Sequence, residues 1–247
     1  NLTTNVFTPE RLEMLRLLSA QAAISLENAT IYQELEDLNK TLEEKVKERT
    51  QELNQSLEDV EKANKKVMDS IQYAKLIQGS LLPNPDEVKQ HLPESFFIWQ
   101  PRDIVGGDIY FTEFFEDGYL VAIMDCTGHG VPGAFMTMVA SSGMKRIIRD
   151  EGCRDPGQIL KRLNFVVKTL LKQDTAQALS DDGLDAAVCL VKPQGKLLVF
   201  AGARLPLLYT HQGEIKEIKG DRHSIGYKRS DLHFTFTNHP INIEEDM

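Results

Sequence analysis

Long apolar runs are absent from this chain of 247 residues. No stretch is apolar enough over about 20 residues to cross a bilayer, and the N-terminus lacks the basic-then-apolar pattern of a signal peptide. Cysteine is scarce, and Cys126, Cys153 and Cys189 form no C-x-x-C pair, which disfavours a thiolate zinc site and fits a reducing compartment. No basic stripe is present, and the net charge of −9 argues against nucleic acid as a partner. A cytoplasmic protein is expected, and whether a parent protein is membrane-anchored stays open.

Residues 8–33 have the pattern of one amphipathic helix. Thr8 suits the N-cap and Pro9 the first helical position. The apolar stripe of this segment consists of Leu12, Leu15, Ala22, Leu26 and Ala29. The stretch FTPERLEMLRLLSAQAAISLENATIY resembles the last helix of a GAF sensor domain. Residues 1–33 are therefore interpreted as the C-terminal helix of a GAF-like domain, with an ordinary packing helix as the alternative.

Residues 34–82 are dense in charge and contain neither glycine nor proline before Gly79. Apolar residues recur at steps of three and four, with a spacing near eleven from Leu35 to Leu57. A seven-residue repeat follows at Leu57, Asn64, Ile71 and Gln78. This pattern predicts a coiled coil with stutters, and Asn64 at a core position favours a parallel homodimer. The piece LEEKVKERTQEL resembles bacterial signalling helices, and a solvated single helix is the alternative.

Pro83 and Pro85 end this helical run, and residues 83–94 are predicted to be a linker. Residues 95–247 alternate strand and helix signals, with a hairpin turn at 116–118. Strands are expected at 96–99, 109–115, 119–124, 185–191, 197–201, 205–210, 214–218 and 232–237, and helices at 133–149 and 155–171. No nucleotide-binding glycine motif is present. An α+β sandwich is therefore predicted, preceded by the coiled coil.

Two acidic residues, Asp108 and Asp125, lie at the ends of predicted strands beside glycine-rich turns. A carboxylate at the end of a buried strand is costly unless it is paired or bound to a cation. Counted outward from Asp117, the two positions reach nearly the same distance along the hairpin, so both side chains are expected at one end of the sheet. Hard oxygen ligands suit Mg²⁺ or Mn²⁺ and do not suit zinc. A turn-capping aspartate and a surface aspartate remain the alternative.

The runs RDIVGGDIY and VAIMDCTGHGVPGAFMTM resemble the PPM-type, protein-phosphatase-2C-like family, and more narrowly the bacterial branch of the stage-II-E sporulation phosphatase and RsbU. Further similar runs follow in the family's order: DGLDAAVCLV, LLVFAGARLPLLY and GEIKEIKGDRHSIGY. The segment SIQYAKLIQGSLLP also resembles the lead into phosphatase domains of the RsbU kind. The resemblance covers roughly residues 70–238 and implies a metal-dependent protein serine/threonine phosphatase.

The resemblance also implies roles for individual residues. Asp125 matches the shared metal-bridging aspartate, the Cys126 backbone carbonyl its companion ligand, and Asp108 the ligand of a second Mn²⁺ or Mg²⁺ ion. Such a pair of ions activates water for attack on phosphorus. Gly128 and Gly130 are expected to bind phosphate through backbone N–H groups. Two further assignments stay open: His129 is a proton donor or a structural turn histidine, and Arg102 holds phosphate or forms an exposed salt bridge.

Outside this set, Asp185 in DGLDAA is interpreted as structural or near the site, and Arg204 receives no role. The family's metal site also needs two later aspartates, and neither has a counterpart before the chain stops at NHPINIEEDM. Two functions therefore stay open. One is a phosphatase gated by the dimeric coil and acting on a phosphorylated STAS-type anti-sigma-factor antagonist. The other is a catalytically incomplete, dimeric scaffold that binds the same partner without hydrolysis.

Overall fold

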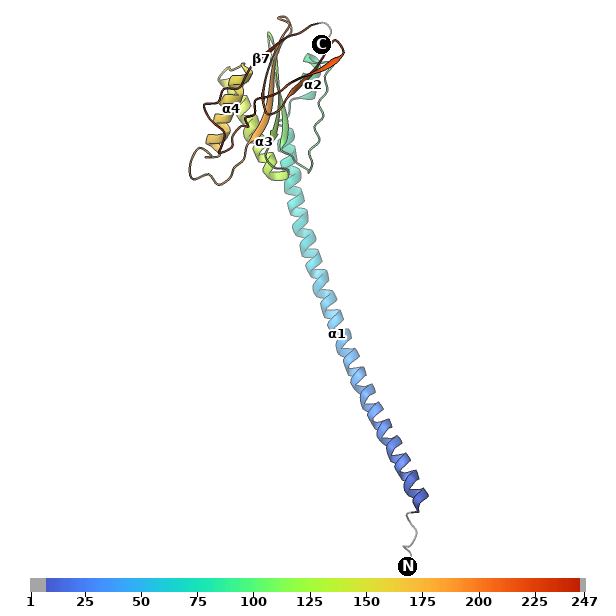
Figure 1. Cartoon of the computed structure of the whole chain (residues 1–247). Helices are drawn as coiled ribbons and strands as arrows, with labels where there is room; N and C mark the ends of the chain where they lie inside the picture. Colours follow the sequence, from blue (N-terminus) through green and yellow to red (C-terminus); the bar gives the residue numbers. More distant parts are fainter. Residues whose placement is uncertain (1–7, 245–247) are drawn as a thin grey trace, which may run out of the picture. The chain divides into compact units, whose positions relative to one another are not determined.

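The computed structural model describes residues 8–244, so residues 1–7 of the predicted sensor helix and the terminal residues 245–247 lie outside the described part (Figure 1). The chain divides into two compact units, residues 1–66 and 67–247.

A single helix, α1 (Pro9–Gly79), runs through the segments predicted as sensor helix and coiled coil. Thr8 begins it as predicted, because its hydroxyl accepts a hydrogen bond from the Arg11 N–H at 3.4 Å. The boundary predicted at residues 33 and 34 falls inside this helix without a break. Large apolar side chains are exposed along the part of α1 within the first unit, including Leu35, Leu42, Val46, Leu53, Leu57 and Val60. No helix among residues 8–244 is both long and apolar enough to cross a membrane.

The segment predicted as a linker contains the short helix α2 (Pro85–His91). Asn84 caps this helix, since its side chain accepts a hydrogen bond from the Asp86 N–H at 3.0 Å. The strand predicted at 96–99 is wrong. This segment contacts the neighbouring strand through side chains in place of a backbone ladder: Phe97 stacks on Tyr110 with ring centroids 4.4 Å apart, and Trp99 Nε1 donates to the Asp108 carbonyl at 2.8 Å.

Five antiparallel strands form the main sheet in the order β1-β2-β3-β4-β7. Their bounds are β1 (Asp108–Phe115), β2 (Gly118–Cys126), β3 (Leu184–Lys192), β4 (Leu197–Ala203) and β7 (His239–Asn242). A separate two-stranded sheet pairs β5 (Leu207–His211) with β6 (Glu214–Ile218). The predicted hairpin between β1 and β2 is confirmed.

The strand predicted at 232–237 is also wrong, and β7 follows it instead. Side-chain contacts hold this segment. Asp221 accepts hydrogen bonds from the backbone N–H and the hydroxyl of Thr237, at 2.7 and 3.1 Å. Phe234 stacks on His223 with ring centroids 4.2 Å apart. The alternating pattern of this segment therefore reflects aromatic packing and not strand pairing.

Two helices pack on the main sheet: α3 (Gly130–Lys145) contacts β1 and β2, and α4 (Pro156–Leu170) contacts β3 and β4. The helix widens into a π-helical turn, η1 (Arg146–Asp150), directly after α3. Asp155, the first residue of the helix predicted at 155–171, caps α4 and accepts a hydrogen bond from the Gln158 N–H at 2.8 Å. The main core lies between helices and sheet and includes Ile109, Leu120, Met124, Met144, Ile159, Leu163 and Val188. The α+β prediction is confirmed, whereas a second large sheet of the predicted sandwich is not found among residues 8–244.

Candidate functional site

Strand register brings the predicted acidic pair together. Asp108 on β1 lies directly opposite Asp125 on β2, as the hairpin count predicted. Asp125 in turn lies opposite Asp185 on β3. Residues directly opposite each other on antiparallel strands point to the same face, with Cβ atoms about 5 Å apart. The sheet therefore carries a row of three carboxylates at one end.

Partial burial and a neighbouring like charge disfavour the charged form of Asp125. Burial raises the pKa of the Asp125 carboxyl above its usual range, and the neighbouring charge of Asp108 and a side-chain hydrogen bond with Asp108 raise it further. Two carboxylates that share one site favour either a proton between them or a bound cation. The pair is thus arranged as a ligand set for a hard cation.

Three glycines pack the two loops of the site against each other. A Cβ on Gly107 would lie 2.4 Å from the Gly128 carbonyl oxygen and 2.7 Å from that of Cys126. A Cβ on Gly133 would lie 2.7 Å from the same Gly128 oxygen. In addition, the Cys126 N–H donates to the Gly107 carbonyl at 3.0 Å. Only glycine permits this approach, which holds the loop before Asp108 against the loop that follows β2.

The thiol of Cys126 is buried, and that burial, with the charges of Asp125 and Asp108, raises its pKa well above the usual range. It therefore stays protonated, which excludes a nucleophilic role at neutral pH. The Cys126 carbonyl lies against Gly107. The contribution of this carbonyl oxygen to a metal site stays a prediction.

His129 and Gly130 lie at the start of α3, and Arg102 lies in the loop that leads to Asp108. His129 is the N-cap of α3, and its Nδ1 lies 2.7 Å from Oδ2 of Asp103, a residue that the sequence did not single out. Arg102 is exposed. A groove of about 530 Å³ runs beside these residues, and it is lined by Ile71, Arg102, Asp103, Ile104, Val105, Gly130 and Val131. The structure therefore brings Arg102 and Gly130 to one groove.

Asp185 has an unusual environment that the sequence did not predict. Its Oδ1 atom is buried without a hydrogen-bond partner, and its Oδ2 lies 3.6 Å from Nε of Arg204. Arg204 adopts a positive φ of 66°, which is uncommon for a residue other than glycine. The interpretation of Asp185 as near the site agrees with this position, and Arg204 supplies a cation next to the row of carboxylates.

Gln78 was predicted to lie in the core of a coiled coil, but the structure buries it against its own domain, with 1% of its surface exposed. Its Nε2 donates to the Gly106 carbonyl at 2.7 Å and to the Thr137 hydroxyl at 2.9 Å. Its Oε1 accepts from the Gly106 N–H at 3.1 Å. The last turn of α1 thus holds the loop that leads to Asp108. The only sign of this contact in the sequence was that Gln78, a polar residue, occupies a position expected to be apolar.

The donor chemistry fits a divalent cation of the Mg²⁺ or Mn²⁺ type, since the groups that meet at Asp108 and Asp125 are hard oxygens. The orphaned oxygen of Asp185 adds an unsatisfied acceptor to the same row. Within residues 8–244, however, no three His, Cys, Asp or Glu side chains lie close enough together to hold a metal ion. The ligands that residues 8–244 offer to a divalent cation are therefore the two facing carboxylates and nearby backbone oxygens.

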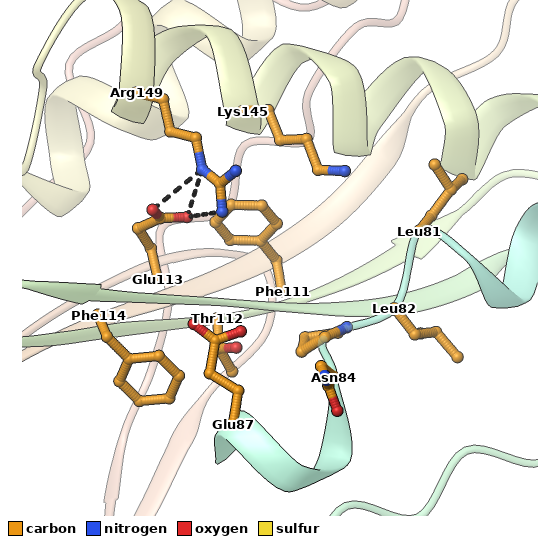
Figure 2. A pocket seen from close by; sticks show the side chains of 11 residues that line it. Leu81, Leu82, Asn84, Glu87, Phe111, Thr112, Glu113, Phe114, Lys145 and Arg149 are labelled. Carbon is orange, nitrogen blue, oxygen red and sulfur yellow. Dashed lines mark hydrogen bonds and ion pairs between the residues drawn. The ribbon is translucent and has the colours of Figure 1, made fainter. Parts of the chain in front are cut away.

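A second cavity, of about 220 Å³, lies elsewhere along β1. Figure 2 shows it around the ion pair of Glu113 and Arg149, in which Nε and Nη2 of the guanidinium each lie 2.8 Å from Oε2. Lys145 and Phe111 line the same cavity. None of the residues that the sequence assigned to the site lies in it, so it is not the site of the predicted chemistry.

Known proteins resemble this chain in sequence and in structure. Residues 116–246 match the family model of stage II sporulation protein E (SpoIIE). The SiaA-PP2C domain of Pseudomonas aeruginosa is 38% identical with a TM-score of 0.64, and the match covers 74% of this chain and 69% of that one. The PP2C phosphatase domain of SpoIIE from Bacillus subtilis, solved with a fragment of its regulatory domain, is 19% identical with a TM-score of 0.43; that match covers 57% and 38%. No curated protein matches the chain significantly.

Proposed function

The chain belongs to the SpoIIE family of PP2C-type phosphatase domains found in bacterial signalling proteins, and on this premise we propose that it hydrolyses phosphoserine and phosphothreonine in a protein substrate with the help of Mn²⁺ or Mg²⁺. The observation that carries the proposal is the position of Asp108 directly opposite Asp125. Without a cation these carboxylates repel each other, which destabilises the folded chain. A bound divalent cation would remove this repulsion, so a cation site explains why the fold places the two side chains side by side.

In this proposal Asp108, Asp125 and the Cys126 carbonyl hold the divalent cations. When bound, such cations activate water and neutralise charge on the phosphate. The protein's own contribution is to fix the ligands. The glycine contact between Gly107 and Gly128 sets the distance between the two loops, and β1 and β2 hold the carboxylates rigidly.

The phosphate is proposed to lie at the start of α3. Gly128 and Gly130 both have positive φ values, of 86° and 60°, and shape the loop directly before the first turn of the helix. Backbone N–H groups at a helix N-terminus favour an anion. Arg102 lines the adjoining groove, and its guanidinium is proposed to bind the phosphate as well.

A phosphorylated STAS-type anti-sigma-factor antagonist is the proposed substrate, because it fits the family of signalling phosphatases to which the chain belongs. The groove supports a protein substrate, since it combines apolar walls at Ile71, Ile104 and Val131 with the charged residues Arg102 and Asp103. Apolar contacts of this kind suit the residues that flank a phosphoserine.

The second candidate function is a scaffold that binds the phosphoprotein without hydrolysing it. It is favoured by the finding that no three metal-ligating side chains meet within residues 8–244. Both functions predict binding, so only turnover separates them.

The deciding experiment measures Mn²⁺-dependent release of phosphate from a phosphoserine peptide by the wild-type chain and by Asp125→Ala. Turnover that requires both Mn²⁺ and Asp125 supports the phosphatase. If the wild-type chain binds a phosphorylated STAS-domain protein but releases no phosphate, the scaffold function replaces it. Calorimetry with the same phosphoprotein supplies the binding arm.

We further propose that α1 dimerises as a parallel coiled coil and controls the site through Gln78. Support for the dimer comes from exposed apolar residues at coiled-coil spacing, such as Leu53 (69% exposed) and Val60 (56%). Support for control comes from the hydrogen bonds of Gln78 to Gly106, two residues before Asp108. A change in helix register would reach the loop through this side chain.

Two experiments test these proposals separately. Leu53→Glu with Val60→Glu should give a monomer in analytical ultracentrifugation, while Gln51→Glu with Gln55→Glu, on the outer face of the same heptads, should stay dimeric. Insertion of four residues after Asn54 shifts the helical register and should change phosphatase activity. Unchanged activity would mean that the coil is only a tether.

A further inference from the structure

A charged cleft of about 360 Å³ adjoins the row of carboxylates. Arg204 links the two, because it lines the cleft and its Nε lies 3.6 Å from Oδ2 of Asp185. Asp185 in turn lies directly opposite Asp125. The strand order β1-β2-β3-β4 puts Arg204, which follows β4, on the side of Asp185 away from Asp108. The cleft therefore begins where the row of carboxylates ends.

The backbone around Arg204 lies where two loops pack closely. The Arg204 N–H donates to the Asp221 carbonyl at 2.9 Å, and the Asp221 N–H donates to the Gly202 carbonyl at 2.8 Å. A Cβ on Gly220 would lie 2.6 Å from the Leu205 carbonyl oxygen, so only glycine permits this approach. Within this frame Arg204 adopts the left-handed conformation, which favours glycine or asparagine. The backbone therefore does not explain an arginine at this position, and a function of its side chain does.

Positive charge predominates in the cleft, although the chain carries a net charge of −9. Three lining residues are cationic, Arg204, Lys219 and Arg222, and two are acidic, Glu217 and Asp221. Both carboxylate oxygens of Asp221 already accept hydrogen bonds from Thr237. Lys219 and Arg222 are exposed, and within residues 8–244 their side chains form no hydrogen bond or ion pair. Their N–H groups are therefore available to an anion that enters the cleft.

The distance from the cleft to the candidate metal site fits a peptide substrate. Neighbouring strands lie about 4.8 Å apart, so Asp185 is roughly 5 Å from Asp125. Nε of Arg204 lies a further 3.6 Å from the Asp185 carboxylate. An extended peptide advances about 3.3 Å per residue, so a span of roughly 9 Å corresponds to two or three residues. A side chain two or three positions from a phosphoserine bound beside Asp125 would therefore reach Arg204.

We propose that this cleft binds an aspartate or glutamate side chain of the substrate, two or three residues from the phosphoserine, and that Arg204 selects it. The inference rests on the proposed phosphatase function and narrows its substrates to phosphoserine segments with a nearby acidic residue. A guanidinium matches a carboxylate through two parallel N–H groups. Asp185 positions Arg204, and Lys219 and Arg222 add positive charge from the loop after β6.

Three phosphoserine peptides test this selection. One carries glutamate two and three residues before the phosphoserine, the second carries glutamate two and three residues after it, and the third carries alanine at all four positions. With Mn²⁺, the wild type should hydrolyse one glutamate peptide with a kcat/KM about tenfold above that of the alanine peptide, the gain expected from a charge-assisted hydrogen bond. Arg204→Gln removes the charge and should lose this preference, chiefly through a lower kcat/KM on the glutamate peptide. Arg222→Gln should lose part of it.

Lys196→Gln is the matched control. Lys196 is also an exposed cation with a positive φ, of 44°, but it lies in the turn between β3 and β4, at the other end of these strands from Asp185 and Arg204. This variant should keep the wild-type preference. Equal hydrolysis of all three peptides by the wild type would overturn the proposal. An equal loss on all three peptides in Arg204→Gln would also overturn it, because Arg204 would then act only through Asp185.

A binding measurement does not depend on turnover and separates this proposal from the proposed function. Fluorescence anisotropy of labelled peptides should give a Kd for one glutamate peptide about tenfold below that of the alanine peptide, and Arg204→Gln should abolish the difference. If the wild type binds with this preference but releases no phosphate, even with Mn²⁺, the phosphatase function fails and the role of the cleft stands. If phosphate is released and neither measurement shows a preference, the phosphatase function stands and the role of the cleft is refuted.

Discussion

Replacement of Gln78 by leucine should destabilise the second unit strongly. The change keeps the side-chain volume close but removes three hydrogen bonds, two of them to the buried backbone of Gly106. Each buried backbone group left without a partner costs about 1–3 kcal/mol. With both groups of Gly106 orphaned, the expected loss in the free energy of unfolding is about 3–4 kcal/mol. Thr137 loses less, because its hydroxyl still donates to the Ala134 carbonyl at 2.8 Å.

Urea unfolding followed by tryptophan fluorescence measures this loss. Trp99 is the single tryptophan of the chain and donates to the Asp108 carbonyl, so it reports on the region of interest. With a slope of about 2 kcal/mol per molar urea, the midpoint should fall by about 1.5–2 M. Gln72→Leu makes the same chemical change at an exposed position of the same helix and should shift stability by less than about 0.5 kcal/mol.

A loss below about 1 kcal/mol for Gln78→Leu would refute the reasoning, since it would mean that water or another group satisfies Gly106. A double-mutant cycle with Thr137→Val localises the effect. Because the two side chains share one hydrogen bond, the double variant should be less destabilised than the sum of the single variants.

Three further predictions concern the site. With divalent cations removed, Asp125→Asn should raise the melting temperature at neutral pH. Burial and the adjacent carboxylate raise the folded-state pKa of Asp125, so the wild type loses stability as pH rises through that pKa. The gain from Asp125→Asn should therefore vanish in acid, where Asp125 is protonated. Gly107→Ala should cost about 1–3 kcal/mol in urea unfolding, because its Cβ would collide with backbone oxygens, whereas Gly79→Ala, with nothing within 4 Å, should be neutral or stabilising. Burial raises the pKa of both Cys126 and Cys153, but Cys153 is partly exposed and Cys126 is buried, so in native protein iodoacetamide should label Cys153 first; mass spectrometry of timed samples checks the order.

Some of the site could be predicted from sequence because the signals were local. The turn at residues 116–118 fixes the hairpin register, so nearly equal distances from it placed Asp108 opposite Asp125. Asp155 before Pro156 marked the start of α4 for the same reason, since capping depends on adjacent residues. The failures at 96–99 and 232–237 have the opposite cause: aromatic side chains there stack on distant residues, which an alternating pattern does not distinguish from strand pairing.

The sequence by itself determined the long helix of residues 9–79, the α+β class and the pair of aspartates, because periodicity, caps and turns act within a few residues. Only the tertiary structure decided which face of the helix the domain covers. Gln78 was predicted at a core position of the coiled coil, but it is buried and donates a hydrogen bond to the Gly106 carbonyl. The structure also joins Asp103 to His129, which lie 26 positions apart in the sequence. Those partners are set by packing between elements distant in sequence, and no local pattern encodes such a contact.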